Sequence, residues 1–540
     1  MSSLSEIANP FVGPRPFERQ DALLFKGRQQ EARDLLTLFL ARRLVLLYAP
    51  SGAGKTSLLK AKVLPDLEQR EQFEVLPVGR VGDSVTPPHD FCGNRFVFNL
   101  LMSLGICEKP ELIATEETSL NHFLLNVGYD GRNFVYFDET EPEAESEAAV
   151  PEALAEDEEV PVQPRALIID QFEEMFTMHP ELEADRIDFF KQVGEAMVND
   201  PYLYVMFSMR GDYLYRIIPY VHLLPNSLRA RFQLQRLQAA GALQAVCEPA
   251  AEAGRPFDAD VAEKLVECLR RVRVADGAEV QEDGERPLGD YVEAMQLQVV
   301  CQQLWYRLAE RPGATISMAD VDWVVGQRST NQAEQADSLD RFVDNALADY
   351  YEEALRRVLN HLQQKGISHV DEYALRRWFS TELITEAGTR DLVARMGKET
   401  KGMPETAVAY LDTELYLIRN EIRAGNNFIE LVHDSFVEPI RTANRKWQEE
   451  LERRIPWLNN ARRYARNPNP SLLLDDYNSL QAARKRVANE AEKGGLPPTT
   501  LQFLESYLAK GEEAYQRQLI QDVPWLNSAR QYAENQNPDL

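Results

Sequence analysis

Short apolar runs alternate with helical stretches along the first half of the chain. Three of these runs, at positions 44–48, 166–169 and 202–207, contain no charged residue. Strands that are buried on both faces of a parallel sheet have this composition, whereas strands with one solvated face alternate apolar and polar residues. We therefore predict an α/β domain with a parallel sheet over residues 25–240. Ligands of such sheets bind at the carboxyl ends of the strands, so the residues that follow the runs are the first candidates for a site.

The patterning divides the rest of the chain into further regions. Residues 1–24 are too few for a domain, and we expect an N-terminal arm. Residues 241–335 have helical periodicity and predict a helical domain. Residues 336–450 mix helices with two apolar runs, Leu415–Arg419 and Phe428–Val432, which predict a hairpin behind helices and hence a winged helix.

The last region, 451–540, contains an internal repeat. Its segment 455–472 recurs at 523–540, with 12 of 18 aligned positions identical at an offset of 68 residues. Each copy predicts an amphipathic helix, and a helical repeat needs a neighbour to cover its apolar face. We therefore expect an α-helical repeat segment, and a longer natural chain that continues beyond Leu540.

Composition and charge narrow the range of functions. The 540 residues include 59 Lys plus Arg and 86 Asp plus Glu, a formal charge of −27 that argues against a general nucleic-acid binder. Residues 138–160 contain 11 acidic residues and no basic one, which predicts a disordered acidic insertion, with a partner-binding tail as the alternative. The chain has no apolar run long enough to span a membrane, no signal peptide and no paired cysteines, so we expect a cytoplasmic protein without membrane contact.

The strongest motif is the segment Ala49–Thr56, APSGAGKT, which follows an apolar run and precedes a helix-forming stretch. This strand–loop–helix order is typical of a phosphate-binding loop, whose N–H groups surround a β-phosphate. We expect Lys55 to contact the β- and γ-phosphates and the Thr56 hydroxyl to bind Mg²⁺. Ala49 replaces the usual first glycine, which is tolerable where φ is negative. The expected nucleotide-binding residues are Gly52, Ala53, Gly54, Lys55, Thr56 and Ser57.

Two further strand ends supply candidate catalytic groups. Asp170 follows four apolar residues and is expected to hold Mg²⁺ through a bound water. Gln171 stands where related ATPases carry a water-activating Glu, so Glu173 and Glu174 are the substitutes, and we favour Glu174. The alternative for both is an acidic helix start. Arg210 lies three residues after the third run, 202–207, at the expected end of that strand. We expect it to contact the γ-phosphate, with a surface pair to Asp212 as the alternative.

The chain resembles the novel STAND NTPases, bacterial relatives of the NOD-like receptors, over residues 9–447. The resemblance rests on an ordered set of motifs: Phe25–Glu31, the phosphate loop, Asp170–Glu174, Ser208–Asp212, Glu248–Ala250 and Glu430–Asp434. It implies a fold of an α/β P-loop NTPase followed by a helical domain, a winged helix and variable flanking modules.

The resemblance also implies further nucleotide-binding residues. Phe25, Gly27 and Arg28 would line the adenine and ribose side, Pro249 would pack on the nucleotide, and His433 would contact the β-phosphate of ADP. The alternatives are an edge turn at Phe25, a helix start at Pro249 and a cap at His433 for a helix over residues 435–454.

The function implied by the resemblance is an ATP/ADP-dependent signalling switch. ADP would keep the domains closed, an unknown protein trigger would allow ATP and Mg²⁺ to bind, and protomers would assemble into a homo-oligomer. Slow ATP hydrolysis would reset the switch, and in bacteria such proteins act in antiphage defence. Two alternatives stay open: a scaffold that binds nucleotide without hydrolysing it, and a winged-helix DNA-binding regulator. The interleaved acidic residues on the basic helix 439–454 argue against the second.

Overall fold

The computed structural model of the chain divides into two compact units. Unit 1 comprises Met1–Tyr350 with Ile418–His433, and unit 2 comprises Tyr351–Leu417 with Asp434–Leu540. The residues that the structure describes are 9–82, 87–88, 91–107, 109–114, 119–129, 133–137, 163–271, 288–311, 313–326, 338–423, 426–474, 476–492 and 498–523. The predicted acidic insertion at 138–160 and all but the first residue of the second repeat copy lie outside these residues.

A five-stranded sheet is the centre of unit 1, and its strand order is β2-β5-β6-β1-β7. All of its pairings are parallel, as the apolar runs predicted. The strands are β1 Leu44–Ala49, β2 Glu74–Val75, β5 Arg165–Ile169, β6 Leu203–Arg210 and β7 Arg231–Gln233. In the register, Ala49 pairs with Arg210 and Ile169 with Phe207, so the phosphate loop, Asp170 and Arg210 emerge at one edge of the sheet.

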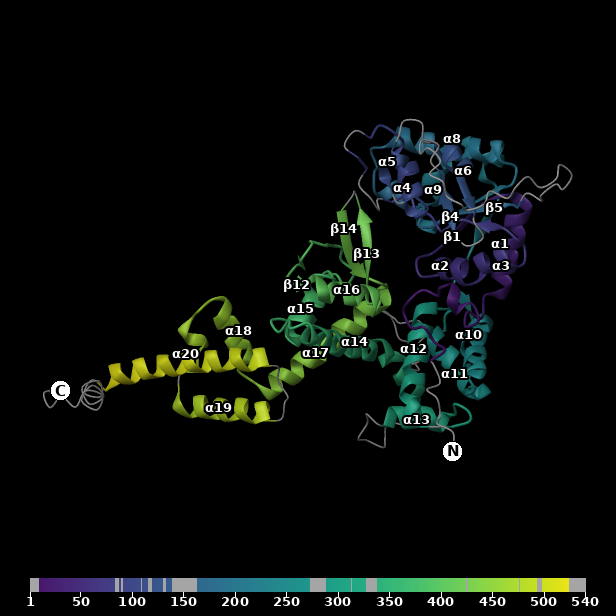
Figure 1. The fold of residues 1–540 in the computed structure, drawn as a ribbon. Helices are drawn as coiled ribbons and strands as arrows, with labels where there is room; N and C mark the ends of the chain where they lie inside the picture. The colour runs from purple at the N-terminus through teal and green to yellow at the C-terminus, as the bar shows by residue number, and fades with distance from the viewer. Residues whose placement is uncertain are drawn as a thin grey trace, which may run out of the picture. The chain divides into compact units, whose positions relative to one another are not determined.

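Helices cover both faces of this sheet, which explains the continuous apolar runs (Figure 1). Alternate residues of one strand belong to different cores: Leu44 and Leu46 to the first, Val45 and Leu47 to the second. The first core is covered by α4 Arg95–Ser103, α5 Pro110–Ile113, α6 Leu120–Leu125, α7 Glu174–Thr177, α8 Glu183–Asn199, α9 Leu214–Ile217 and η4 Ile218–Leu223. The second is covered by α1 Gln29–Arg42 and by the continuous helical run α2 Lys55–Leu58, η2 Leu59–Val63 and α3 Leu64–Gln69.

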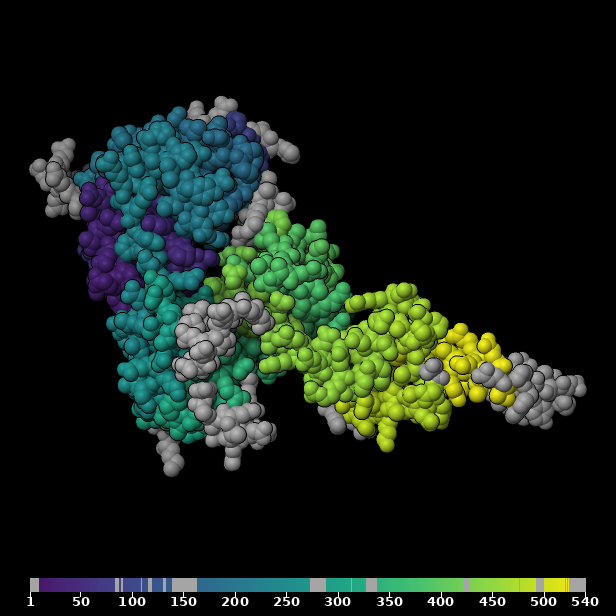
Figure 2. All heavy atoms as spheres, turned by 180° about the vertical axis from the view of Figure 1, so that it is seen from behind, coloured from purple at the N-terminus to yellow at the C-terminus, as the bar shows by residue number. Residues whose placement is uncertain are grey.

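A set of helices follows the sheet, as the periodicity of 241–335 predicted. It consists of α10 Ala239–Glu252, α11 Ala259–Arg270, α12 Ala294–Arg307, α13 Met318–Gly326 and the first part of α14 Ser338–Gln364. Residues 9–17 pack on this set, with Phe11 almost fully buried between Phe257 and Trp305. Figure 2 shows the N-terminal part of the chain, in purple, next to the teal helices. The expected arm is therefore an anchored part of unit 1.

A β-hairpin far along the chain also belongs to unit 1. It consists of β13 Ile418–Arg423 and β14 Asn426–Leu431, and pairs Ile418 with Leu431. The predicted hairpin is present, but its first strand starts three residues later than predicted, because Leu415 and Leu417 are buried outside it. The remaining short elements of unit 1 are η1 Arg19–Asp21, β3 Val127–Tyr129, β4 Phe134–Tyr136, η3 Gly211–Tyr213, η5 Pro225–Leu228, β8 Leu237–Gln238, β9 Tyr291–Val292 and η6 Leu308–Glu310.

Unit 2 is largely helical. After the second part of α14 it contains α15 Glu372–Thr381, β10 Val393–Ala394, β11 Glu399–Thr400, β12 Met403–Pro404, α16 Glu405–Thr413, η8 Asp434–Phe436, α17 Val437–Arg454, α18 Leu458–Arg466, η9 Pro470–Leu472, α19 Tyr477–Glu492 and α20 Pro498–Asp522. The first repeat copy contains the helix α18 near its start, as predicted. The ring of Trp457 stacks on the ring of Tyr507 in α20, with 5.5 Å between the ring centroids. None of the described helices combines the length and hydropathy needed to span a membrane.

Candidate nucleotide-binding site

The phosphate loop joins the buried strand β1 to the helical run that starts at Lys55. Gly52 and Gly54 have φ angles of +75° and +89°, which side chains with a Cβ rarely adopt, so glycine is required at both positions. Ala49 lies within β1 without a positive φ, as the substitution of the usual glycine predicted. Burial lowers the pKa of Lys55, although Glu173 and Asp170 oppose this shift. The loop therefore holds an ammonium group that lacks sufficient counter-charge from the protein.

Thr56 and Asp170 form a compact set of oxygen atoms at the start of the helical run. The Thr56 hydroxyl donates to Oδ2 of Asp170 at 2.7 Å, and the buried Ser208 hydroxyl donates to Oδ1 at 2.7 Å. Asp170 is only 2% exposed, so both hydrogen bonds fix its carboxylate. Hydroxyl and carboxylate oxygens are hard ligands of the kind that Mg²⁺ prefers, and the pair fits the expected magnesium site.

The two candidate catalytic carboxylates have different surroundings. Glu173 accepts the backbone N–H of Arg210 at 3.1 Å, and burial raises its pKa although Lys55 opposes the shift. Glu174 begins α7; with the Gln171 amide turned so that its nitrogen faces this carboxylate, the nitrogen donates to Oε1 of Glu174 at 2.8 Å and the amide oxygen accepts from Arg80 at 2.9 Å. Gln171 has a φ of +54°, a conformation that costs energy for a residue with a Cβ. Both carboxylates line the cavity, Glu173 beside Lys55 and Arg210 and Glu174 beside Gln171, and the choice of Glu174 as the catalytic group stays a prediction.

Arg210 combines the two predicted environments. Its Nη2 donates to Asp212 at 2.7 Å, which is the predicted surface pair. Its Nε, however, is buried and has no hydrogen-bond partner within the described parts of the chain. A buried donor without a partner carries a desolvation cost that a ligand oxygen would relieve.

The β13–β14 hairpin brings His433 to the phosphate loop. A Cβ on Gly52 would collide with the His433 imidazole, so the two residues are in close contact. Nε2 of His433 lies 3.1 Å from Oε1 of Glu293, just before α12. The alternative, a cap at His433, stays a prediction: the 3-10 turn η8 begins at Asp434, directly after His433, and leads into α17 at Val437, while Asp434 pairs with Arg390.

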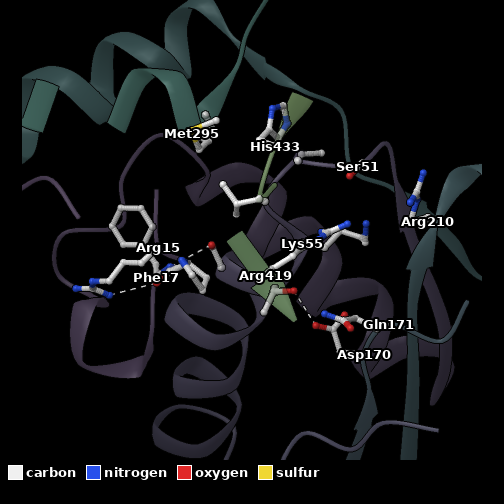
Figure 3. Close-up of a pocket in the computed structure, with 18 of the residues that line it drawn as sticks. Arg15, Phe17, Ser51, Lys55, Asp170, Gln171, Arg210, Met295, Arg419 and His433 are labelled. Atoms are coloured by element: carbon white, nitrogen blue, oxygen red, sulfur yellow. Dashed lines mark hydrogen bonds between the residues drawn. The ribbon is translucent and has the colours of Figure 1, made fainter. Parts of the chain in front are cut away.

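These groups line one cavity of about 730 Å³ in unit 1. Figure 3 shows Ser51, Lys55, Asp170, Gln171 and Arg210 toward one end and Arg15 and Phe17 toward the other. Of the residues proposed from the sequence, those that line it are Phe25, Arg28, Gly52, Ala53, Gly54, Lys55, Thr56, Ser57, Asp170, Glu173, Glu174, Arg210 and His433.

Two proposed residues are not among the lining residues. Gly27 has a φ of +82°, and a Cβ there would collide with the Gly241 carbonyl, so it serves the close packing of the α1 entry on α10. Pro249 is buried inside α10 and does not start this helix. Arg28 lines the cavity, but its guanidinium donates to the Ala53 carbonyl at 3.1 Å and to Glu31. These hydrogen bonds hold the backbone of the phosphate loop in place.

Several lining residues were not found from the sequence. Among them are Arg15, Phe17, Arg80, Met295 and Arg419. Each is distant in sequence from the phosphate loop or lies in a segment without a recognised motif. Of these segments, only Gly13–Phe17 has an unusual composition, rich in Gly, Pro and Arg. This composition led to the prediction of an N-terminal arm and not of a site.

The family described as Novel STAND NTPase 1 matches residues 10–467 of the chain. The chain belongs to this family. The match includes the sheet, the phosphate loop, Asp170, Arg210 and His433 in a single span, which agrees with the ordered motifs of the sequence. No curated protein matches the chain at the threshold applied.

Solved structures resemble this family member only remotely. The Aeropyrum pernix ORC2 protein in ADPNP–ADP complexes is 13% identical with a TM-score of 0.33, and the match covers 78% of this chain and 95% of that chain. Drosophila ORC bound to DNA is 13% identical with a TM-score of 0.33, covering 82% and 92%. A Walker-type ATPase of Pyrococcus abyssi is 12% identical with a TM-score of 0.31, covering 79% and 98%. We transfer no ligand or partner from these structures.

Proposed function

We propose that this STAND NTPase is an ATP/ADP-dependent switch whose nucleotide cavity controls the hairpin that carries His433. The observation that carries the proposal is the contact of His433 with Gly52 of the phosphate loop. The chain passes from unit 2 into unit 1 at Ile418 and returns to unit 2 at Asp434. A change at the phosphate loop would therefore reach unit 2 through both ends of the hairpin.

Each part of the cavity has a defined role in the proposed chemistry. Lys55 would bind the β- and γ-phosphates, and Arg210 would direct its Nε to the γ-phosphate. Thr56 and Asp170 would hold Mg²⁺, which neutralises phosphate charge when bound. Glu173 would orient the attacking water, because its buried carboxylate adjoins both Lys55 and Arg210.

His433 would distinguish ADP from ATP. Its imidazole has Glu293 as a carboxylate partner, and a β-phosphate would offer a second anionic partner on the loop side. A contact made only in the ADP state stabilises that state alone, and a shift from 1:99 to 99:1 requires about 5.5 kcal/mol of differential binding. Release of the hairpin would allow protomers to assemble with an unknown protein trigger or effector. By analogy within the family, the output is antiphage defence in the bacterial cytoplasm.

Replacement of His433 tests the proposal. His433→Ala should weaken ADP binding by about 10- to 150-fold and ATP binding less, since a charge-assisted contact contributes about 1.5–3 kcal/mol. Calorimetry gives both affinities, and light scattering should detect oligomers of the variant with ATP. His369→Ala, at an exposed histidine outside the cavity, is the control. An unchanged ratio of the two affinities in a wholly monomeric variant would exclude the switch.

The second candidate is a scaffold that binds nucleotide without turnover. Gln171 directly after Asp170 favours it, because a Gln cannot accept a proton from water. A wild-type protein that binds ATP but shows no phosphate release, even as an oligomer, would establish this function in place of the hydrolytic reset.

A further inference from the structure

The N-terminal segment Gly13–Phe17 is held at both of its ends. On one side, the backbone N–H of Val12 donates to Oε1 of Gln298 at 3.0 Å, and the Gln302 amide donates to the Phe11 carbonyl at 3.2 Å. On the other side, the backbone N–H of Phe17 donates to Oγ of Ser57 at 3.2 Å. The segment therefore connects α12 to the helical run of the phosphate loop.

An ion pair fixes the shape of this segment. Arg15 donates to both carboxylate oxygens of Asp21, at 2.6 and 2.8 Å, and Asp21 also accepts the Glu18 backbone N–H at 2.8 Å. Asp21 is 5% exposed, and the hydrogen bond from Arg15 lowers the pKa of its carboxyl despite the opposing effect of burial. The pair therefore stays ionised at neutral pH, and a bidentate pair of this kind holds a loop in one geometry.

The segment forms one wall of the cavity at the end opposite the phosphate-binding groups. All five of its residues line the cavity, together with Phe25, Ala294 and Met295. The Phe17 ring meets Phe25 edge-on at 5.1 Å. Figure 3 shows Arg15, Phe17 and Met295 away from Asp170 and Arg210. Among the described lining residues, the carboxylates are those of Asp170, Glu173 and Glu174. They lie at the phosphate-binding end of the cavity, near Lys55 or Gln171.

We propose that Gly13–Phe17 is the wall that holds the nucleobase, and that the Arg15–Asp21 ion pair positions it. The inference rests on the proposed nucleotide function. A planar base needs apolar groups against its faces, which Pro16, Phe17 and Met295 supply. Arg15 is therefore a positioning residue for the base.

The test compares a ligand with a base and a ligand without one. ADP and inorganic tripolyphosphate are titrated calorimetrically into the full-length chain, in the presence of Mg²⁺. Arg15→Met should weaken ADP binding by about 10-fold or more, because a released wall no longer fits the base, while tripolyphosphate affinity stays within about two-fold. Arg19→Met is the matched control, since Arg19 lies in η1 together with Asp21, pairs with Glu68 and does not line the cavity.

The outcomes separate this inference from the proposed function. Unchanged ADP affinity in Arg15→Met overturns the inference, and so does an equal loss for ADP and tripolyphosphate, which would place the effect on the phosphate loop. If Arg15→Met fails to fold, Phe17→Leu is subjected to the same comparison with the same expected split. Failure of the wild-type chain to bind either ligand would instead refute the nucleotide site itself.

Discussion

Two clusters of buried charge in this protein are built in opposite ways. In unit 2, the side chain of Arg376 is 4% exposed and is surrounded by Glu352, Glu372 and Asn444, with the Trp447 ring 5.0 Å away. Burial by itself would lower its pKa, but Glu352 reverses the shift and raises it. The protein thus supplies every partner that this cation needs.

The nucleotide cavity of unit 1 leaves its charges under-compensated. Burial dominates at both Lys55 and Glu173, so the pKa of Lys55 is lowered and that of Glu173 is raised although the two attract each other. The Arg210 Nε is buried without a partner among the described residues. A fully paired cluster stabilises a fold, whereas an incompletely paired one is a place where a ligand gains binding energy.

The largest expected effect is the loss of nucleotide binding in Lys55→Ala. This change removes the cation for the β- and γ-phosphates but no core side chain, so ADP and ATP binding should become undetectable in a folded protein. Calorimetry measures binding and circular dichroism measures folding. Lys62→Ala, which lies on the same helical run and pairs with Asp66, should bind as the wild type does. Equal affinities in wild type and Lys55→Ala would refute the cavity assignment.

Removal of Arg376 should produce the opposite result. Arg376→Met should lower the free energy of unfolding by about 3 kcal/mol, because it leaves Glu352 and Glu372 without their shared partner. The loss lies at the lower end for a broken buried ion pair because the two carboxylates are partly exposed. Nucleotide affinity should not change. Chemical denaturation measures the loss, and Arg356→Met, at a residue 69% exposed, should cost less than about 0.5 kcal/mol. Equal losses in the two variants would contradict the comparison.

Glu173→Gln should slow ATP turnover by about 10²-fold while ATP binding survives. Because the raised pKa of Glu173 means that burial opposes its ionised form, wild-type stability should fall as pH rises above the ordinary carboxyl value of 4.5, and the variant should lose less. Phosphate release and thermal unfolding across pH measure the two effects. Glu174→Gln is the matched comparison, and a greater loss of turnover there would identify Glu174 as the catalytic group.

The smallest expected effect is proton uptake on nucleotide binding. A bound phosphate stabilises the Lys55 ammonium and raises its lowered pKa. The affinity for ADP is therefore highest at pH values below the pKa of Lys55 in the free protein, and it falls as the pH rises toward the pKa of Lys55 in the bound protein. Titrations of ADP in buffers with different ionisation enthalpies should reveal uptake of less than one proton at alkaline pH below the ordinary lysine value of 10.5. Absence of uptake across the alkaline range would contradict a lowered Lys55 pKa in the free site.

The parallel sheet and the phosphate end of the site could be predicted from local patterns in the chain. A strand, a glycine loop and a helix start are contiguous in the chain, so Gly52, Gly54, Lys55 and Thr56 are specified by local conformation. Asp170 could be predicted for the same reason, because it ends an apolar run that has to be a buried strand.

Distant segments complete the cavity in a way that is visible only in the folded chain. Glu173 and Glu174 both line the cavity but have different partners there, and the role of Gly27 depends on the Gly241 carbonyl. His433 and Phe17 reach the phosphate loop from hundreds of residues downstream and from an apparent arm upstream. Such contacts depend on the packing of whole elements against one another, and no local pattern of hydrophobic and polar residues encodes that packing.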